Sequence, residues 1–201
     1  MAQNNRSHAA EKTGPGQPGS VKVWDPVVRA FHWTIVAGFA AEMFLTEEGK
    51  WLHRWIGYGI AVAILGRIIW GFIGSPHARF ADFVPRPGRL KAYLVALGKG
   101  REPRYIGHNP AGAVMMLSLM GLMGAACLTG WMQGLDQFWG VEWVQELHEV
   151  CANAILVLAG AHVLAAFVES YRHRENLIWT MITGNKKRAS GSDIDHANPS
   201  R

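Results

Sequence analysis

Four long apolar segments most constrain what this chain can fold into. Each is roughly 18 to 25 residues long, about the length that an α-helix needs to cross a bilayer. A soluble four-helix bundle would carry a polar stripe on every helix, whereas residues 111–128 hold only Ser118 as a polar side chain and no charge. The sequence therefore predicts an all-α fold, an integral membrane four-helix bundle. Its helices are expected over residues 27–45, 51–73, 111–131 and 144–168.

Polar stretches flank this bundle and divide its halves. Residues 1–22, rich in Gly, Pro and Gln, are expected to form a disordered tail, and residues 185–201 a second polar tail. One membrane domain is expected between them, over residues 23–184. Asp25-Pro26 and Asn109-Pro110 are typical helix starts, because Asp or Asn caps the first turn and Pro fits its first position. Residues 89–97, inside the long polar stretch 77–108, are expected to form a short surface helix.

The distribution of the +5 formal net charge predicts the orientation of the bundle. Basic residues gather before the first apolar segment, between the second and third, and after the fourth. The other two connections hold mainly acidic residues, among them Glu47, Glu48 and Asp136. By the positive-inside rule, both termini and the long middle connection are cytoplasmic. Since the basic residues are split among three membrane edges, the charge indicates lipid as a partner and no nucleic acid.

Four histidines fall at two matched depths of the predicted bundle. His148 and His162 lie fourteen residues apart on one apolar segment, hence on one helix face and about 21 Å apart along its axis. The predicted orientation puts His32 and His162 near the cytoplasmic side, and His53 and His148 near the outer side. Each pair comes from two different helices. Such pairs are what bis-imidazole ligation of two haems requires.

Other interpretations of these histidines remain open from the residues alone. A single His in an apolar helix is more often a hydrogen-bonded core residue, and a haem-free transporter could use histidines as a proton or metal relay. Neither needs two matched depths. No segment has the spacing of a zinc site. Cys127 and Cys151 lie outside any Cys-x-x-Cys-His motif, which argues against covalent haem attachment, and two small core residues are the simpler interpretation.

Arg67 and His108 are further candidates for cofactor binding. Arg67 follows His53 by fourteen residues and so shares its helix face at the depth of the inner pair. A buried Arg needs an anionic partner such as a haem propionate, and the alternative is a side chain that reaches up to lipid headgroups. His108 opens the third segment. A propionate contact, a quinone-site residue, a rival haem ligand and a polar helix cap all remain open for it.

At these residues the chain resembles the bacterial di-haem b-type cytochromes, the cytochrome b-561 group that includes the b subunit of nickel–iron hydrogenases. The likeness covers residues 23 to about 188. The matching stretches are 23–26 with Arg29, His32 and Trp33, then 53–58, 67–71, 78–80, 104–112, 129–130, 148–162 and 173–177.

The resemblance implies two non-covalent haems b, with His32, His53, His148 and His162 as axial ligands of the haem irons, in the bacterial cytoplasmic (inner) membrane. It implies electron transfer between the quinone/quinol pool and a partner redox protein, such as a c-type cytochrome or a hydrogenase at the periplasmic side or the membrane. Two histidines on each iron leave no open position for a substrate, which favours electron transfer. Whether the chain is an electron-transfer protein or the cytochrome subunit of a quinone-linked oxidoreductase stays open. Quinol oxidation also needs a proton acceptor, for which Glu42, His108 and Glu149 are candidates by position. An anchor subunit of a hydrogenase or dehydrogenase complex, which could also hold haem, and a homodimer are the further possibilities.

Overall fold

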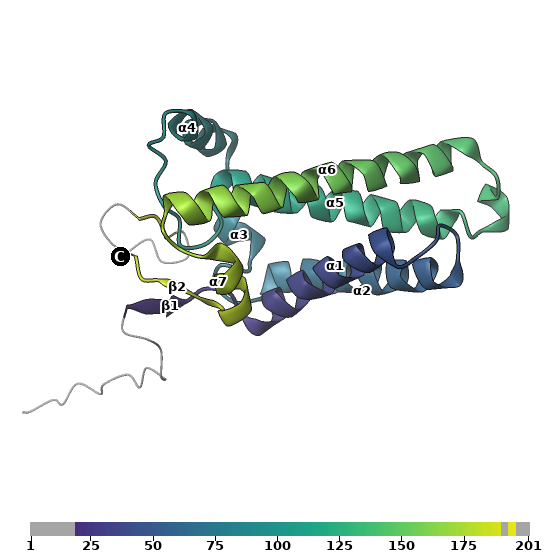
Figure 1. Cartoon of the computed structure of the whole chain (residues 1–201), viewed down its shortest axis with the longest axis horizontal. Coiled ribbons are helices and arrows are strands. Elements are labelled where there is room, and N and C mark those ends of the chain that lie inside the picture. The colour runs from purple at the N-terminus through teal and green to yellow at the C-terminus, as the bar shows by residue number, and fades with distance from the viewer. Residues whose placement is uncertain (1–18, 190–192, 196–201) are drawn as a thin grey trace, which may run out of the picture.

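Four long helices lie side by side along the long axis of the molecule in the computed structural model (Figure 1). The structure describes residues 19–189 and 193–195. Helix α1 packs against α2, α2 against α5, and α5 against α6. The expectation of a mainly helical chain is confirmed, and each long helix begins and ends within a few residues of the predicted segment. They are α1 (Pro26–Phe44), α2 (Trp51–Ile73), α5 (Pro110–Met132) and α6 (Glu142–Arg172).

Two of these helices begin as the sequence predicts. Asp25 Oδ1 accepts a hydrogen bond from the Val28 amide at 2.9 Å, and Asn109 Oδ1 accepts one from the Gly112 amide at 2.6 Å. Each cap is followed by a Pro in the first turn. The second oxygen of Asp25 accepts hydrogen bonds from Trp70 Nε1 and from the Ser75 hydroxyl. The cap of α1 therefore also ties it to the end of α2.

Apolar side chains fill the middle of the helix assembly. Ile60 and Ile64 of α2 meet Met123 of α5 and Ile155 of α6 in one buried cluster. Gly38 lets α1 approach α2 closely, since a Cβ there would lie 3.0 Å from the Ile60 side chain. Both cysteines are free thiols, and Cys151 is buried.

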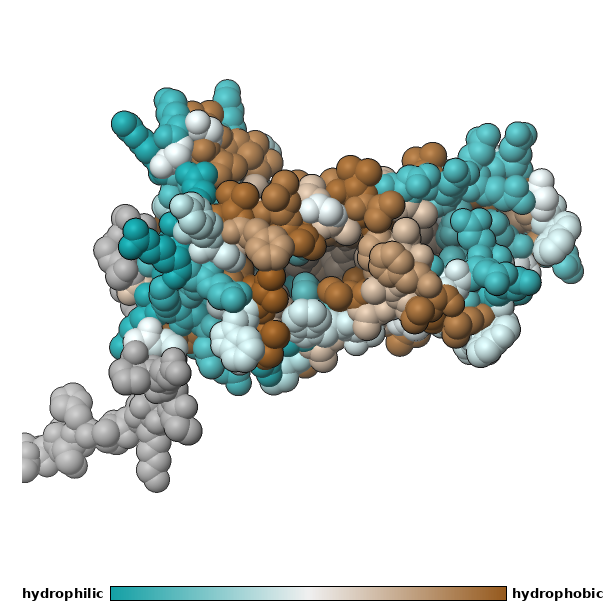
Figure 2. Space-filling view, viewed as in Figure 1, coloured by the Kyte–Doolittle hydropathy of each residue, from teal (hydrophilic) through white to brown (hydrophobic). Residues whose placement is uncertain are grey.

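Three of the four expected spans, α2, α5 and α6, are long and apolar enough to cross a membrane. Helix α1 is not among them, because Arg29, His32 and Glu42 fall within its 19 residues. Figure 2 shows hydrophobic side chains around the middle of the molecule and hydrophilic ones at both ends. Val62 at the centre of α2 and Val157 at the centre of α6 are about 70% exposed, as expected for surfaces that face lipid. A crossing by α1 and the cytoplasmic location of the termini stay predictions.

In the described part of the chain, one end of the molecule carries all the short elements except η1. We call it the cap end, and the end that holds η1 (Asp136–Phe138) the far end. The cap end consists of α3 (Phe80–Phe83), α4 (Pro87–Gly98), α7 (Leu177–Thr183) and the strands β1 (Ser20–Lys22) and β2 (Asn185–Lys187). Helix α4 contains the surface helix expected over residues 89–97.

The two short strands join the ends of the described chain. They pair antiparallel, with Ser20 opposite Lys187 and Lys22 opposite Asn185. The pairing links the first and second polar tails of the sequence-based division. Arg104 Nη2 donates to the Lys187 carbonyl oxygen of β2 at 2.8 Å, and its guanidinium also forms ion pairs with Glu175 at 2.9 Å and with Asp193 at 2.6 Å. The domain boundaries at 22/23 and 184/185 stay predictions, and residues 1–18, 190–192 and 196–201 lie outside the described part.

Candidate functional site

The far-end histidines come together between two helices. His53 lies in the first turn of α2, and His148 in the second turn of α6. Their ring centroids are 6.1 Å apart, with an angle of 76° between the planes. Two imidazoles on opposite sides of one metal ion, each bonded at about 2 Å, have centroids about 6 Å apart. The spacing of His53 and His148 thus suits a shared metal ion.

Hydrogen bonds orient both rings through Nδ1. His53 Nδ1 lies 2.5 Å from Glu42 Oε2 on α1. His148 Nδ1 lies 2.9 Å from the Ala126 carbonyl oxygen and 3.1 Å from Thr129 Oγ1, both on α5. A ring that donates its Nδ1 proton leaves Nε2 unprotonated, which is the form that ligates a metal. Each far-end histidine therefore has its orientation and tautomer set by a neighbouring helix.

A glycine on α5 makes room for the His148 ring. A Cβ at Gly130 would lie 3.1 Å from His148 Cε1 and 3.5 Å from its Nδ1. The neighbouring Thr129 is buried, and its hydroxyl also bonds the Ala125 carbonyl at 2.8 Å. The Thr129-Gly130 pair therefore positions His148, one residue through a hydrogen bond and the other through its lack of a side chain.

The second pair lies toward the cap end. His32 is on α1 and His162 on α6, and both residues are half-buried. His32 Nδ1 is buried and has no hydrogen-bond partner among the described residues. The Trp33 ring meets the His32 ring edge-on at 5.2 Å. The pairing of His32 with His162 therefore stays a prediction, and in the described part of the chain His32 Nδ1 lacks the kind of hydrogen bond that orients the far-end rings.

Arg67 is buried inside the cap end. Only 2% of the residue is exposed, so its guanidinium does not reach up to the lipid-facing surface. Its Nη2 donates to the Ala78 carbonyl at 2.9 Å, and its Cζ lies 5.3 Å from the centre of the Phe80 ring. Its Nη1 is buried without a partner among the described residues. A buried cation with a free donor fits an anionic ligand, because removing an unpaired charge from water costs on the order of several kcal/mol.

His108 lies beside Arg67, between two aromatic rings. Its centroid is 4.8 Å from that of Trp24 and 4.8 Å from that of Phe83. Burial, together with the positive charges of Arg67 and Lys186, lowers the pKa of His108 to about 3, so the ring is neutral at physiological pH. Its buried Nδ1 has no partner in the described part of the chain.

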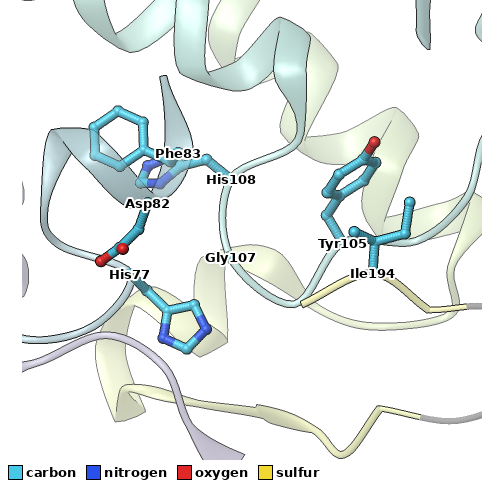
Figure 3. A pocket seen from close by; sticks show the side chains of 7 residues that line it. All are labelled: His77, Asp82, Phe83, Tyr105, Gly107, His108 and Ile194. Atoms are coloured by element: carbon cyan, nitrogen blue, oxygen red, sulfur yellow. The ribbon is translucent and has the colours of Figure 1, made fainter. Parts of the chain in front are cut away.

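Figure 3 shows a small cavity beside His108. His108 and Phe83 lie on one side of it, and Tyr105 and Ile194 on the other. Its volume is about 10 Å³, enough for one water molecule and far too small for a quinone ring. The cavity therefore gives no support to a quinone-site role for His108.

The residues at both ends fit haem. At the far end, the ring centroids of His53 and His148 have the spacing of two imidazoles on opposite sides of one iron ion. At the cap end, Arg67 Nη1 and His108 Nδ1 are buried without a hydrogen-bond partner among the described residues. Haem offers an iron ion for the imidazoles and propionates for the cationic side chain.

A cluster of Glu102, Glu169 and His173 also has the composition of a metal site, with ligand atoms within 4.8 Å of one another. Its carboxylates already have protein partners. Arg172 Nη2 bonds Glu102 at 2.7 Å, and the Tyr93 hydroxyl donates to Glu169 at 3.0 Å. Burial and the charge of Glu169 raise the pKa of Tyr93, so the hydroxyl keeps its proton. The cluster therefore attaches α4 and the connection after it to the end of α6.

Sequence-based reasoning missed the residues that orient the ligand candidates. Glu42 was considered only as a proton acceptor, whereas the structure places it against His53. Thr129 carried no signal beyond its place in a family motif. Lys186, assigned to a polar tail, is buried and donates to the Tyr105 carbonyl at 3.1 Å. A polar side chain inside an apolar helix, such as Glu42, was the one detectable signal among these.

Comparison with known proteins agrees with this geometry. The model of the family "Prokaryotic cytochrome b561" matches residues 23–184. A probable Ni/Fe-hydrogenase B-type cytochrome subunit of Rhodobacter capsulatus is 27% identical, with 83% of this chain and 81% of the relative covered. A protein of the same description from Bradyrhizobium diazoefficiens is 26% identical, with 89% and 92% covered. No solved structure matches the chain.

The family match spans both histidine pairs and all four long helices. It agrees with the resemblance drawn from the sequence motifs, and it supports haem b, electron transport and membrane helices for this chain. The chain therefore belongs to the prokaryotic cytochrome b561 family.

Proposed function

We propose that this protein carries electrons across the bacterial inner membrane through two haem b groups, between the quinone pool and a partner redox protein. One observation carries the proposal: the rings of His148 on α6 and His53 on α2 lie with their centroids 6.1 Å apart, and α6 carries a second histidine, His162, fourteen residues further on. The two histidines of α6 are thus about 21 Å apart along the helix axis. Two sites at that separation form a path along the bundle.

In this proposal His53 and His148 hold the far-end haem, and His32 and His162 the cap-end haem. The irons would supply the redox chemistry by taking up and releasing single electrons. Two imidazoles per iron leave no position for oxygen or substrate, which favours electron transfer over bond-making catalysis. The protein fixes the distance, keeps water away with its apolar core, and orients the rings through their Nδ1 partners.

Arg67 and His108 complete the cap-end site. The free Nη1 of Arg67 would pair with a haem propionate, which compensates the buried positive charge. Neutral His108 would offer the same group a hydrogen bond from Nδ1. The cavity of about 10 Å³ beside His108 leaves room for a bridging water molecule.

The cap end is proposed to face the cytoplasm, with α1 as the fourth span. Its short elements and connections carry most of the basic residues, and the far-end connections carry acidic ones. A partner at the periplasmic side would then meet the far end. Since the relatives are described as hydrogenase cytochrome subunits, a hydrogenase or another redox protein such as a c-type cytochrome is the proposed partner.

The test is the haem content of the purified protein. The expected result is a reduced-minus-oxidised spectrum of b-type haem, with two haems per chain by pyridine haemochrome assay. One haem per chain would mean that one histidine pair is wrong. No haem, after expression with ample haem supply, would overturn the proposal and favour a haem-free transporter.

A further inference from the structure

We propose that Glu42 is a positioning residue that makes the far-end haem the lower-potential site of the two, by accepting a hydrogen bond from its ligand His53. The inference rests on the proposed di-haem function. It predicts different reduction potentials for the two haems, whereas the spacing of the histidines alone does not distinguish the two sites.

The contact between Glu42 and His53 joins two helices. Glu42 lies near the end of α1, and its Oε2 is 2.5 Å from His53 Nδ1. The Thr46 hydroxyl donates to the same oxygen at 2.9 Å and thereby fixes the rotamer of the carboxylate. The Glu42 side chain is only 14% exposed, and its Oε1 is buried without a partner among the described residues. A carboxylate so placed is costly, and its direct partner is the imidazole.

Within the described part of the chain, neither His148 nor His32 has a carboxylate as its Nδ1 partner. His148 Nδ1 faces two neutral oxygens, the Ala126 carbonyl and the Thr129 hydroxyl. His32 Nδ1 has no partner among the described residues. Of the hydrogen bonds that the structure gives to these rings, the one from His53 is therefore the one made to a carboxylate.

A carboxylate at Nδ1 changes what the ring donates to iron. It draws the Nδ1 proton toward itself, which makes the ring a more basic ligand. A more basic ligand, together with a negative charge held in an apolar region, stabilises the oxidised and more positive state of the iron. The reduction potential of the far-end haem is therefore lowered, whereas the cap-end site has the cation of Arg67 beside it. Both effects separate the potentials in the same direction.

The experiment is a redox titration of the intact protein, followed by the absorbance of the reduced haems, in the wild type and in Glu42→Gln. Gln keeps the size and an acceptor oxygen but removes the charge. In Glu42→Gln the lower of the two midpoint potentials should rise by ~59 mV, which corresponds to a tenfold change in the equilibrium constant of a one-electron reduction. The matched control is Glu47→Gln, which makes the same change on the next connection at a side chain that is 82% exposed. Its potentials should equal those of the wild type.

A second measurement assigns the shift to a site. His162→Ala should remove the cap-end haem, and Glu42→Gln in that background should still raise the potential of the haem that remains. Electron paramagnetic resonance of the oxidised protein should show altered g values for that haem alone. If the Glu42→Gln protein fails to bind the far-end haem, the test uses Glu42→Asp instead. This change keeps the negative charge, so the far-end haem should keep its low midpoint potential.

Two results would overturn the inference: potentials in Glu42→Gln equal to those of Glu47→Gln, or a shift confined to the cap-end haem. An upward shift in Glu42→Asp as large as the one expected for Gln would count against it as well. These outcomes differ from a failure of the proposed function, in which the wild type itself would hold fewer than two haems.

Discussion

A single hydrogen atom, the side chain of Gly130, decides how closely the His148 ring approaches α5. In Gly130→Ala the new Cβ would lie 3.1 Å from Cε1, so the imidazole must shift by a few tenths of an ångström. We expect this change to lower the haem content from two per chain toward one, measured by pyridine haemochrome assay, because the ligand leaves its position opposite His53. Gly160→Ala is the matched control, since nothing lies within 4 Å of a Cβ there. Full haem content in Gly130→Ala would contradict the placement of His148.

The contacts of single residues could be predicted from the sequence where both partners lie close together along the chain. The Asp25 and Asn109 caps depend on neighbours three residues away, and both are confirmed. The pairing of Glu42 with His53 was not predicted. It depends on how α1 is rotated against α2, and that rotation is fixed by packing that no local pattern records.

At the scale of elements, the long helices were predictable and the strand pair was not. A span of about 20 apolar residues is a strong signal, whereas strands of three residues with basic side chains have no period to detect. Ser20–Lys22 and Asn185–Lys187 pair although almost the whole sequence lies between them. Patterns of neighbouring residues therefore assigned them to two separate tails. The same pairing buries Lys186, whose charge would otherwise place it in solvent.

The strand pair should make stability depend on pH in the alkaline range. Burial, opposed by Glu175, lowers the pKa of Lys186 from 10.5 to about 8 in the folded protein. Between these values the unfolded chain still binds the proton that the folded chain has released, so stability rises with pH through this window. The thermal unfolding midpoint in detergent should therefore rise more from pH 8 to pH 10.5 in the wild type than in Lys186→Met. Lys22→Met, at an exposed position of β1, should keep the wild-type dependence; equal slopes in all three proteins would refute the burial of Lys186 as the cause.

At the scale of the whole molecule, the proposed function makes α6 the helix that sets the separation of two haem sites. In that proposal α6 supplies one histidine to each site, α1 supplies the second ligand of the cap-end site, and α2 that of the far-end site. Because the sites share a helix but no ligand, their occupancies should be independent apart from overall stability.

This independence makes the pairing testable by combination. His32→Ala and His162→Ala, alone or together, should each leave about one haem per chain, because all three variants damage the same site. His32→Ala combined with His53→Ala should leave none, since one ligand of each pair is lost. Haem content and the reduced-minus-oxidised spectrum of the purified variants measure this, with Asn153→Ala on the opposite face of α6 as a control that keeps both haems. If His32→Ala with His162→Ala were empty while His32→Ala with His53→Ala kept one haem, the ligands would be paired along the bundle in another way, and the depth-matched arrangement would be wrong.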